Sequence, residues 1–516
     1  MNRMIQCTLV VAAGFALMAC NRSPTNPETT ATPRTDGTAA PAAGTDMPAP
    51  GDALTTGAVA LPFGSIDLKG GLPATPADTQ KLFDQLDFQQ ASQSYLWGLP
   101  IVAFAEWEHA HSSIFGAKPS DLVLYSNYTD RLGILTANAT TPYIMSFTDM
   151  SKTGPMVIQL PPGPTAGGLG DFWQREIAVI GEMGPDAGKG AKYLIVPPGT
   201  TPPSEAGYRV IQSPTVNFFF GIRALDPNAE KAMALVRQVK IYPFSERANP
   251  PETRLVSPEG KSWYGGQPRG LDYWKRLHAI LQVEPVAERD RFFMAMLANL
   301  GIEKGKPFQP DERQQKILLQ GALTGELMAK ANTFDKRFVG AKHWPDRRWD
   351  YILVMPDPDQ RIGNYDALLE RAAYFYEAVT YSKAMTSKTP GEGQAYLATY
   401  TDKDGQWLDG DQNYTLHVPA NPPAKLFWSV TVYDSDTRAL IDNEQKRGDR
   451  SSRDKLKLNT DGSVDLYFGP KAPVGNEENW VQTIPGRPWY GYVRFYGPTE
   501  GYFDKSWKLP DIERVK

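Results

Sequence analysis

The chain has 516 residues, with 54 Lys and Arg against 58 Asp and Glu, which gives a formal net charge of −4. Phosphate binding needs a concentrated basic surface, so this balance, without a long basic run, argues against a nucleic-acid partner. If the chain is cut before Cys20, its two cysteines, Cys7 and Cys20, allow no internal disulfide, and they supply no cysteine nucleophile or cysteine-ligated zinc site.

The first 20 residues have the pattern of a bacterial lipoprotein signal peptide. Arg3 precedes an apolar stretch that starts at Met4, and residues 17–20 (Leu-Met-Ala-Cys) form a lipobox, in which the cysteine after the cut is lipidated. An ordinary signal peptide or a short membrane anchor is the alternative, but the stretch is shorter than the roughly 20 residues that span a bilayer. We therefore expect a signal peptide over residues 1–19 and an acyl chain such as palmitate on Cys20.

The segment after the cut predicts a tether to a membrane. Residues 20–61 are mostly Pro, Thr, Ala, Gly and Asp, with too few large apolar side chains to offset the entropy of ordering, so we expect them to be disordered. Asn21 stands where lipoproteins kept in the inner membrane resemble one another in having Asp. We therefore expect an outer-membrane lipoprotein of the cell envelope, on the periplasmic face, with the N-terminal lipid as its only membrane anchor.

A helix and a series of short strands follow. Helical spacing begins at Thr75, where Pro76 and Asp78 are start signals, and continues to Leu96. Strand-sized apolar runs, separated by Gly and Pro clusters, follow at residues 122–125, 143–147, 156–160, 177–180 and 193–196. This pattern predicts an N-terminal β-rich domain over residues 75–225.

Long helical segments come next, and strands return at the end. Helical spacing covers residues 228–240, 271–281, 286–300, 310–331 and 365–386, which predicts a helical region over residues 226–390. Strand patterns at residues 427–433 and 464–468 predict a C-terminal β domain over residues 391–516. The expected fold class is a multidomain α+β protein with two β-sandwich or jelly-roll-like domains joined by a helical region.

Several sequence words resemble one protein family. They are residues 427–434 (FWSVTVYD), 459–467 (NTDGSVDLY), 478–480 (ENW) and 494–498 (RFYGP), and in the N-terminal half residues 95–100 (YLWGLP), 138–143 and 171–190. They are similar to the family that pairs an N-terminal domain of unknown function, DUF1254, with a C-terminal one, DUF1214. The resemblance implies two β-sandwich or jelly-roll-like domains joined by helices, and it implies no activity.

The chain departs from this family at one position of chemical interest. Many members carry Asn-x-Asp-Thr where this chain has Asn138, Ala139, Thr140 and Thr141. A role as metal ligand or base that rests on that acid therefore lacks its carboxylate here.

Three residues between two strand patterns form the first candidate site. If residues 171–176 are one strand, alternation places Asp171, Trp173 and Arg175 on one face. A carboxylate, an indole and a guanidinium together suit a sugar ring or another polar ligand. The alternative is an Asp–Arg pair that braces a sheet beside a packed tryptophan.

Two further groups are candidates for ligand binding. Asn138, Thr140 and Thr141 lie beside Tyr143 and predict either the polar rim of a pocket or a turn whose side chains satisfy the backbone. Family resemblance places Asp434 and Arg494 at strand ends, where the alternative to ligand binding is a salt bridge.

Metal and cofactor motifs are weak. Asp402, Asp404, Asp409 and Asp411 suggest a calcium loop, but an EF-hand's ligand order and closing Glu are missing, and a polar hairpin explains the same residues. The five histidines form no metal signature, and no nucleotide or dinucleotide fingerprint is present. We expect no metal and no cofactor.

Two functions remain open at this point. The first is a lipid-anchored envelope protein of unknown activity that binds a glycan or small polar ligand in a β-sandwich pocket. The second is a cofactor-independent hydrolase or lyase with an acid pair such as Asp171 and Glu176, or Asp171 and Asp434. If Asp171 and Glu176 lie back to back across a sheet, they cannot work jointly.

Overall fold

The computed structural model describes residues 55–226, 228–386 and 388–515 of a mixed α+β chain. The chain divides into two compact units, Met1–Asp78 and Thr79–Lys516. The predicted signal peptide, Cys20 and residues 20–54 of the predicted tether lie outside the described residues.

The first unit contains a small antiparallel sheet of β1 (Gly57–Leu61), β2 (Gly64–Lys69) and β3 (Leu72–Pro73). Gly70 and Gly71, at φ +60° and +77°, form the tight turn from β2 to β3, which needs positive φ. The prediction of disorder through Leu61 is therefore wrong for Gly57–Leu61. Val59 pairs with Ile66, which lies beyond the predicted tether, so the tether's own composition did not reveal the strand.

The long helix α1 (Pro76–His109) continues into a π-helical turn at Ala110–Ile114. It runs well past the predicted end at Leu96, although Pro100 lies inside it and lacks the N–H of a helical hydrogen bond. Side chains on every side of this half of the helix, such as those of Leu99 and Val102, are fully buried. Packing on all sides therefore outweighs the cost of the proline.

The other main helices lie in the middle of the chain, and the first of them belongs to the first β-rich part, where Val236 lies in the core. They are α3 (Ala229–Val236), α4 (Leu271–Val283), α5 (Arg291–Asn299), α6 (Glu312–Phe334) and α7 (Leu368–Glu377). Three helices are shorter than predicted, and the one predicted over residues 286–300 is reduced to α5. Residues 240–243 pair with β6 as strand β12, and the predicted helix over residues 365–386 is reduced to α7, with β16 (Tyr365–Asp366) before it.

Two sheets make up the first β-rich part. One has the order β13-β4-β5-β11-β7-β8 and the other β10-β9-β6-β12. Their strands are β4 (Leu122–Tyr125), β5 (Tyr143–Asp149), β6 (Met156–Leu160), β7 (Thr165–Asp171), β8 (Glu176–Gly181), β9 (Ala191–Val196), β10 (Arg209–Gln212), β11 (Asn217–Ala224), β12 (Lys240–Pro243) and β13 (Leu255–Val256). Side chains from both sheets, including Ile195 and Phe218, share one hydrophobic core.

Two more sheets make up the C-terminal part. Their orders are β14-β17-β23-β19-β20 and β22-β21-β18-β24. The strands are β14 (Asp350–Tyr351), β17 (Gln394–Thr399), β18 (Tyr414–Val418), β19 (Ala424–Asp434), β20 (Asp449–Ser451), β21 (Val464–Gly469), β22 (Trp480–Gln482), β23 (Trp489–Pro498) and β24 (Glu513–Arg514). Leu416 and Val430, one from each sheet, lie in their common core.

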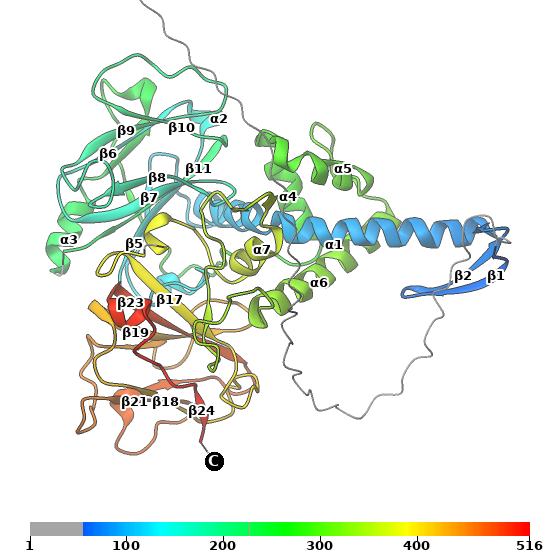
Figure 1. The fold of residues 1–516 in the computed structure, drawn as a ribbon. Helices are drawn as coiled ribbons and strands as arrows, with labels where there is room; N and C mark the ends of the chain where they lie inside the picture. The colour runs from blue at the N-terminus through cyan, green and yellow to red at the C-terminus, as the bar shows by residue number, and fades with distance from the viewer. Residues whose placement is uncertain (1–54, 227, 387, 516) are drawn as a thin grey trace, which may run out of the picture. The chain divides into compact units, whose positions relative to one another are not determined.

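A third core connects these parts within the second unit. It contains the buried half of α1 together with Phe219 of β11 and Tyr492 of β23. In Figure 1, β17, β19 and β23 lie below β5, β7 and β11, with α7 beside them. The six-stranded sheet and the five-stranded sheet therefore each contribute one face to the same interior region.

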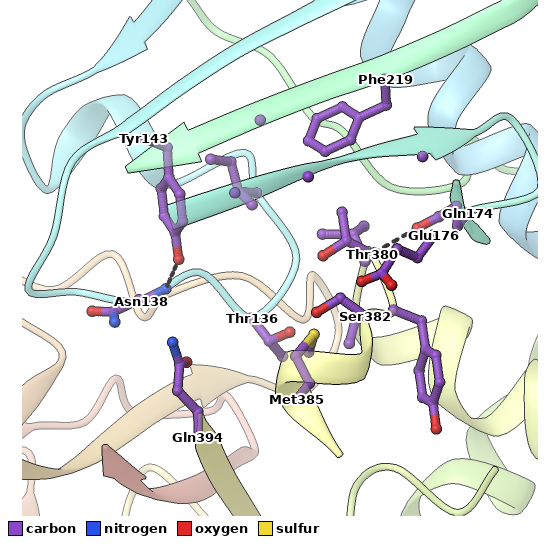
Figure 2. A pocket seen from close by; sticks show the side chains of 18 of the residues that line it. Thr136, Asn138, Tyr143, Gln174, Glu176, Phe219, Thr380, Ser382, Met385 and Gln394 are labelled. Atoms are coloured by element: carbon purple, nitrogen blue, oxygen red, sulfur yellow. Dashed lines mark hydrogen bonds between the residues drawn. The ribbon is translucent and has the colours of Figure 1, made fainter. Parts of the chain in front are cut away.

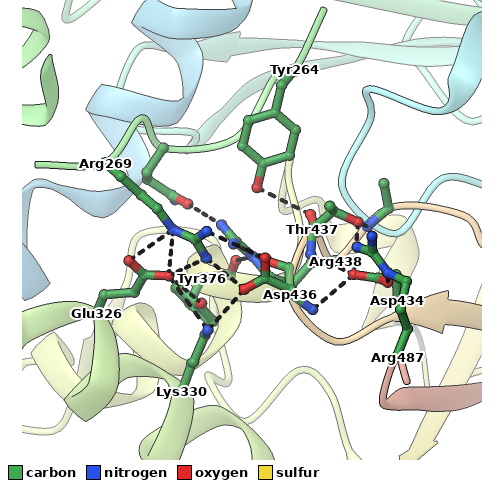
Figure 3. A network of polar contacts seen from close by, with 12 residues as sticks. Tyr264, Arg269, Glu326, Lys330, Tyr376, Asp434, Asp436, Thr437, Arg438 and Arg487 are labelled. Atoms are coloured by element: carbon green, nitrogen blue, oxygen red, sulfur yellow. Dashed lines mark hydrogen bonds and ion pairs between the residues drawn. The ribbon is translucent and has the colours of Figure 1, made fainter. Parts of the chain in front are cut away.

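A polar network joins the helices to the C-terminal part (Figure 3). Arg438, which is 3% exposed, donates hydrogen bonds to the carbonyl of Tyr376 (3.1 Å), the carbonyl of Asp436 (2.8 Å) and Oε1 of Gln267 (3.0 Å). Arg269 forms ion pairs with Glu326 of α6 at 2.7 Å and with Asp436 at 2.6 Å.

Candidate functional site

A cavity of about 250 Å³ lies between the six-stranded sheet and the five-stranded sheet. Its walls come from α1, β5, β7, β8 and β11, from the segment after α7, and from β17 and β23. Figure 2 shows Asn138, Tyr143 and Gln394 at one end of this cavity and Glu176, Thr380 and Ser382 at the other. Sequence segments more than 200 residues apart therefore form one site.

The floor of the cavity lacks side chains because β7 and β11 carry glycines there. Gly168 and Gly170 of β7 pair with Gly221 and Phe219 of β11, and all four line the cavity. A Cβ at Gly170 would meet no heavy atom closer than 3.6 Å, at the carbonyl oxygen of Arg175. Glycine weakens a strand, and its use here leaves free space above the centre of a sheet.

Aromatic side chains form one wall. Phe104 and Trp107 of α1 are fully buried and line the cavity together with Phe219. The ring of Phe219 lies 5.2 Å from that of Phe104 and 6.1 Å from that of Trp107. Such packed rings give a rigid apolar surface.

The other wall is polar and comes from alternate residues of β23. Tyr492, Arg494 and Tyr496 face the cavity, while Val493 and Phe495 lie in the core of the C-terminal part. This is the two-residue alternation of a strand.

Arg494 is the buried cation of this wall. Its guanidinium donates hydrogen bonds to Oγ1 of Thr431 at 3.1 Å and to the carbonyl of Thr136 at 2.9 Å. It also lies 5.2 Å from the ring centre of Tyr492 and 5.7 Å from that of Tyr396, within cation–π distance.

Asn138 organises the hydroxyls of the polar end. Its backbone N–H donates to the hydroxyl of Tyr143 at 3.0 Å, and its Nδ2 donates to the hydroxyl of Tyr496. Its Oδ1 accepts hydrogen bonds from the N–H and the hydroxyl of Thr140, both at 2.6 Å, which fixes the orientation of the amide. The pocket rim and the local turn, which the sequence offered as alternatives, are both present around Asn138.

Burial keeps the tyrosines of this end neutral. It raises the pKa of Tyr496 to about 12, and it also raises the pKa values of Tyr396 and Tyr492 above the ordinary value. The hydroxyls can therefore accept and donate hydrogen bonds at neutral pH without adding negative charge.

The structure brings together four of the nine ligand-binding candidates. Asn138, Tyr143, Arg175 and Arg494 line the cavity. Thr140 and Thr141 do not line it. Thr140 orients Asn138, and the carbonyl of Thr141 accepts from Arg131 at 3.0 Å.

The predicted common face of Asp171, Trp173 and Arg175 is wrong. Residues 171–176 are not one strand, because β7 ends at Asp171 and β8 begins at Glu176, and Gln174 between them has a φ of +62°. The ion pair is real, since Asp171 Oδ2 lies 2.7 Å from Arg175 Nε. Trp173 points into the core and packs against Trp97 at 4.9 Å.

Asp171 is not available to a ligand. It is completely buried and accepts the backbone N–H and the Nε–H of Arg175. Glu176 does line the cavity, and burial raises the pKa of its carboxyl. Because Asp171 lies outside the lining, the predicted acid pair of Asp171 and Glu176 does not form in this cavity.

Asp434 and Arg494 do not form a pair. Asp434 ends β19, where it accepts from the N–H groups of Asp436 and Thr437 and forms an ion pair with Arg487 at 2.5 Å. The family resemblance predicts a strand end for Arg494 as well. Arg494 instead lies in the interior of β23, opposite Ser429.

The predicted calcium loop is used for turn hydrogen bonds. Asp402 accepts from the N–H groups of Asp404 and Gln406, and Asp409 accepts from that of Asp411. Across residues 55–226, 228–386 and 388–515, no group of three or more His, Cys, Asp or Glu could hold a metal ion. No helix in this part of the chain is long and apolar enough to cross a membrane.

The sequence interpretation missed several residues of the site. These residues lie on strands β7 and β11, and neither strand was among those predicted. They are Arg223, Phe219 and the glycines of the floor. The available signals were Gly167, Gly168 and Gly170 in a strand-length segment and the alternation Tyr490, Tyr492, Arg494, Tyr496. A single charge within an aromatic stripe indicates a functional face better than the charge alone.

Two families match parts of the chain. Both are described as protein of unknown function, DUF1254 at residues 122–243 and DUF1214 at residues 393–500. No curated protein matches the chain.

Two solved structures are similar to it. The VPA0106 protein from Vibrio parahaemolyticus matches with a TM-score of 0.51 and 18% identity, over 83% of this chain and 100% of that one. An uncharacterized protein from Burkholderia cenocepacia has a TM-score of 0.39 and 13% identity, over 86% of this chain and 91% of its own. At this identity the first likeness shows a common fold alone.

Proposed function

The chain belongs to the family that pairs DUF1254 with DUF1214, as its sequence words predict, and from the cavity lined by both domains we propose that it binds a small amphipathic molecule. The observation that carries this proposal is the glycine floor. A sheet loses packing where Gly170 replaces a larger residue and leaves room for a Cβ, and a ligand that occupies this space compensates for that loss.

The chemistry of the cavity walls favours a small amphipathic molecule over a glycan chain. Phe219 lines the cavity and packs on the fully buried rings of Phe104 and Trp107, so the ligand surface against Phe219 is removed from water. An amphipathic molecule matches one aromatic wall and one polar wall, whereas a glycan chain needs polar partners along its whole length.

A binding role is better supported than the hydrolase or lyase alternative. Among the described residues that line the cavity, Glu176 is the only carboxylate, and it accepts the backbone N–H of Lys383 at 3.1 Å. Acid–base catalysis by a pair of carboxylates therefore has only one of its two carboxylates in this cavity. Turnover of a bound probe would contradict a purely binding role.

Substitution of one floor glycine tests this function. Gly170→Ala adds a methyl group to the cavity floor, and we expect it to weaken binding of 3-phenylpropionate or 3-phenylpropionamide about tenfold in titration calorimetry. Gly491→Ala is the matched control, because Gly491 also lies in a central strand with space for a Cβ but does not line the cavity. Absence of saturable binding, or equal binding by both variants, would overturn the proposal.

The same proposal places the protein in the cell envelope, held by a lipid on Cys20. Its support is the lipobox at residues 17–20 and the tether-like composition that follows. Cells fed labelled palmitate should label the full chain and the control Cys7→Ser, but not Cys20→Ser. Label on Cys20→Ser would contradict the anchor.

A further inference from the structure

The polar end of the cavity holds a buried positive charge without a compensating carboxylate. Arg494 is 4% exposed, and among the described residues no carboxylate oxygen lies within 4 Å of its guanidinium nitrogens. Burial of an unpaired charge is costly unless a partner arrives. The neutral tyrosines around it lower this cost through cation–π contact but supply no negative charge.

Arg494 also has donors to spare. A guanidinium has five N–H donors, of which Thr431 and Thr136 accept two and the hydroxyl of Tyr433 can take a third. The two that remain are the number needed for a bidentate contact with a carboxylate.

Two tyrosine hydroxyls add to this donor set. The hydroxyl oxygens of Tyr143 and Tyr496 each accept a hydrogen bond from Asn138, so each hydroxyl hydrogen is left to donate. In the described part of the chain, neither hydrogen has a protein acceptor. The polar end of the cavity therefore presents hydrogen-bond donors from β5 and β23. These donors favour a ligand group that has several acceptor atoms.

A second cation lines the same end. Arg223 lies on β11 on the cavity face that also carries Gly221 and Phe219. No ion pair or side-chain hydrogen bond joins Arg223 to the described residues. In the antiparallel pairing of β11 with β5, Ile222 lies opposite Ile144, so the next residues, Arg223 and Tyr143, come beside each other at this end of the cavity.

The remaining charges of the lining do not cancel these two. Arg175 is neutralised by Asp171, and Glu176 lies at the end of the cavity opposite Asn138 (Figure 2). The polar end therefore keeps its positive potential.

From these contacts we propose that the polar end binds the carboxylate of the ligand, with Arg494 as its principal partner, Tyr143 and Tyr496 as further donors, and Arg223 as a second positive charge. This inference rests on the proposed function, because the apolar body of the same ligand lies against Phe219, which packs on Phe104. A carboxylate is favoured over a phosphate because one negative charge and two acceptor oxygens suit a single buried guanidinium next to an aromatic wall.

Matched acid and amide probes test the head group. We expect 3-phenylpropionate to bind at least about tenfold more tightly than 3-phenylpropionamide, because the amide keeps the body and removes the charge. Arg494→Met should remove this preference while amide affinity changes by less than about threefold. Equal affinity of the two probes for the unmodified protein would overturn the carboxylate site and leave the proposed small-molecule function standing.

Two further variants keep the test open if Arg494→Met does not fold. Tyr496→Phe removes only a hydroxyl, and Arg223→Gln removes a charge that has no protein partner among the described residues. Each should lower the acid-to-amide ratio about threefold or more, and an unchanged ratio in both would contradict the site. Inorganic phosphate that displaces 3-phenylpropionate at lower concentration than acetate does would overturn the choice of carboxylate. If neither probe binds, the proposed function itself fails.

Discussion

The Nη2 group of Arg494 donates a hydrogen bond to the carbonyl oxygen of Thr136, 2.9 Å away, although 358 residues separate them in sequence. Tyr433 of β19 donates to the carbonyl of Ala137 at 2.7 Å, so the C-terminal sheet holds the loop that carries Asn138. Thr136 has a φ of +44°, a conformation that a threonine rarely adopts without such support. The polar end of the cavity is therefore built by both domains together.

Removal of this contact should destabilise the fold. Arg494→Met leaves the hydroxyl of Thr431 without its donor and the half-buried carbonyl of Thr136 with only the long contact from Tyr433 at 3.4 Å, at a cost of about 2–4 kcal/mol. Arg494→Lys should cost less, since an ammonium can keep one of the two bonds. Urea unfolding measures both, and a midpoint for Arg494→Met equal to that of the unmodified chain would refute the structural role.

A buried histidine predicts acid sensitivity. His111 Nε2 and the hydroxyl of Tyr125 share a hydrogen bond of 2.7 Å, and Trp107 Nε1 donates to the same hydroxyl at 2.8 Å, so a neutral His111 with a bare Nε2 can accept the hydroxyl hydrogen. Burial lowers the pKa of His111 to about 3, so as the pH falls the unfolded chain takes up this proton before the folded chain does. Between pH 6.5 and 5 the free energy of unfolding should therefore fall by about 2 kcal/mol from this group.

The variant His111→Gln isolates that contribution. It removes the titrating ring and keeps an acceptor for Tyr125, so its unfolding free energy should change less steeply from pH 6.5 to 5. The comparison uses the slope, because lost packing shifts stability equally at both pH values. An identical slope in the two proteins would show that folding does not lower the pKa of His111.

The buried ion pair of Lys336 and Glu377 predicts that the effects of substituting these two residues on stability are strongly coupled. Lys336 Nζ and Glu377 Oε1 lie 3.4 Å apart with both side chains fully buried, and Tyr400 donates to Glu377 at 2.8 Å. Lys336→Met leaves a buried carboxylate unpaired and should cost about 3–5 kcal/mol. The double variant Lys336→Met/Glu377→Gln should be more stable than Lys336→Met alone.

An exposed pair is the control for this cycle. Lys275 and Asp272 are 2.9 Å apart but 62% and 71% exposed, so Lys275→Met should change stability by less than about 1 kcal/mol. Lys336 and Glu377 would not interact if the stability lost by Lys336→Met/Glu377→Gln equalled the sum of the losses of Lys336→Met and Glu377→Gln.

The sequence predicts local elements better than it predicts the site. The runs at residues 122–125 and 156–160 match β4 and β6 exactly, because apolar runs between turn residues determine such strands locally. The alternation assumed for residues 171–176 fails because Asp171 closes a turn through the backbone N–H of Arg175, a contact that alternation alone cannot reveal.

The site itself depends on contacts between distant segments. Arg494 was a candidate through family resemblance, but its partner Thr136 and its neighbour Arg223 lie on other strands and loops. Nothing in the sequence around Arg494 indicates that it contacts the segments of Thr136 and Arg223. The role of Thr140 is equally indirect, because it acts through Asn138 and does not reach the cavity.

Arg438 holds the centre of the polar network in Figure 3. Its guanidinium reaches the carbonyls of Tyr376 and Asp436 and Oε1 of Gln267, and it lies 4.2 Å from the ring centre of Tyr376. A lysine cannot reach three acceptors in one plane, so Arg438→Lys should cost about 2–4 kcal/mol despite its retained charge.

Lys330→Met provides the matched control within the same network. Lys330 pairs with Asp436 at 3.2 Å, but Arg269 also holds that carboxylate, and both Lys330 and Asp436 are partly exposed. Its loss should therefore cost less than about 1 kcal/mol. Urea midpoints of the two variants decide the matter. If they shift equally, the planar geometry of Arg438 contributes nothing beyond its charge, and the connection between α7 and the end of β19 depends on net charge alone.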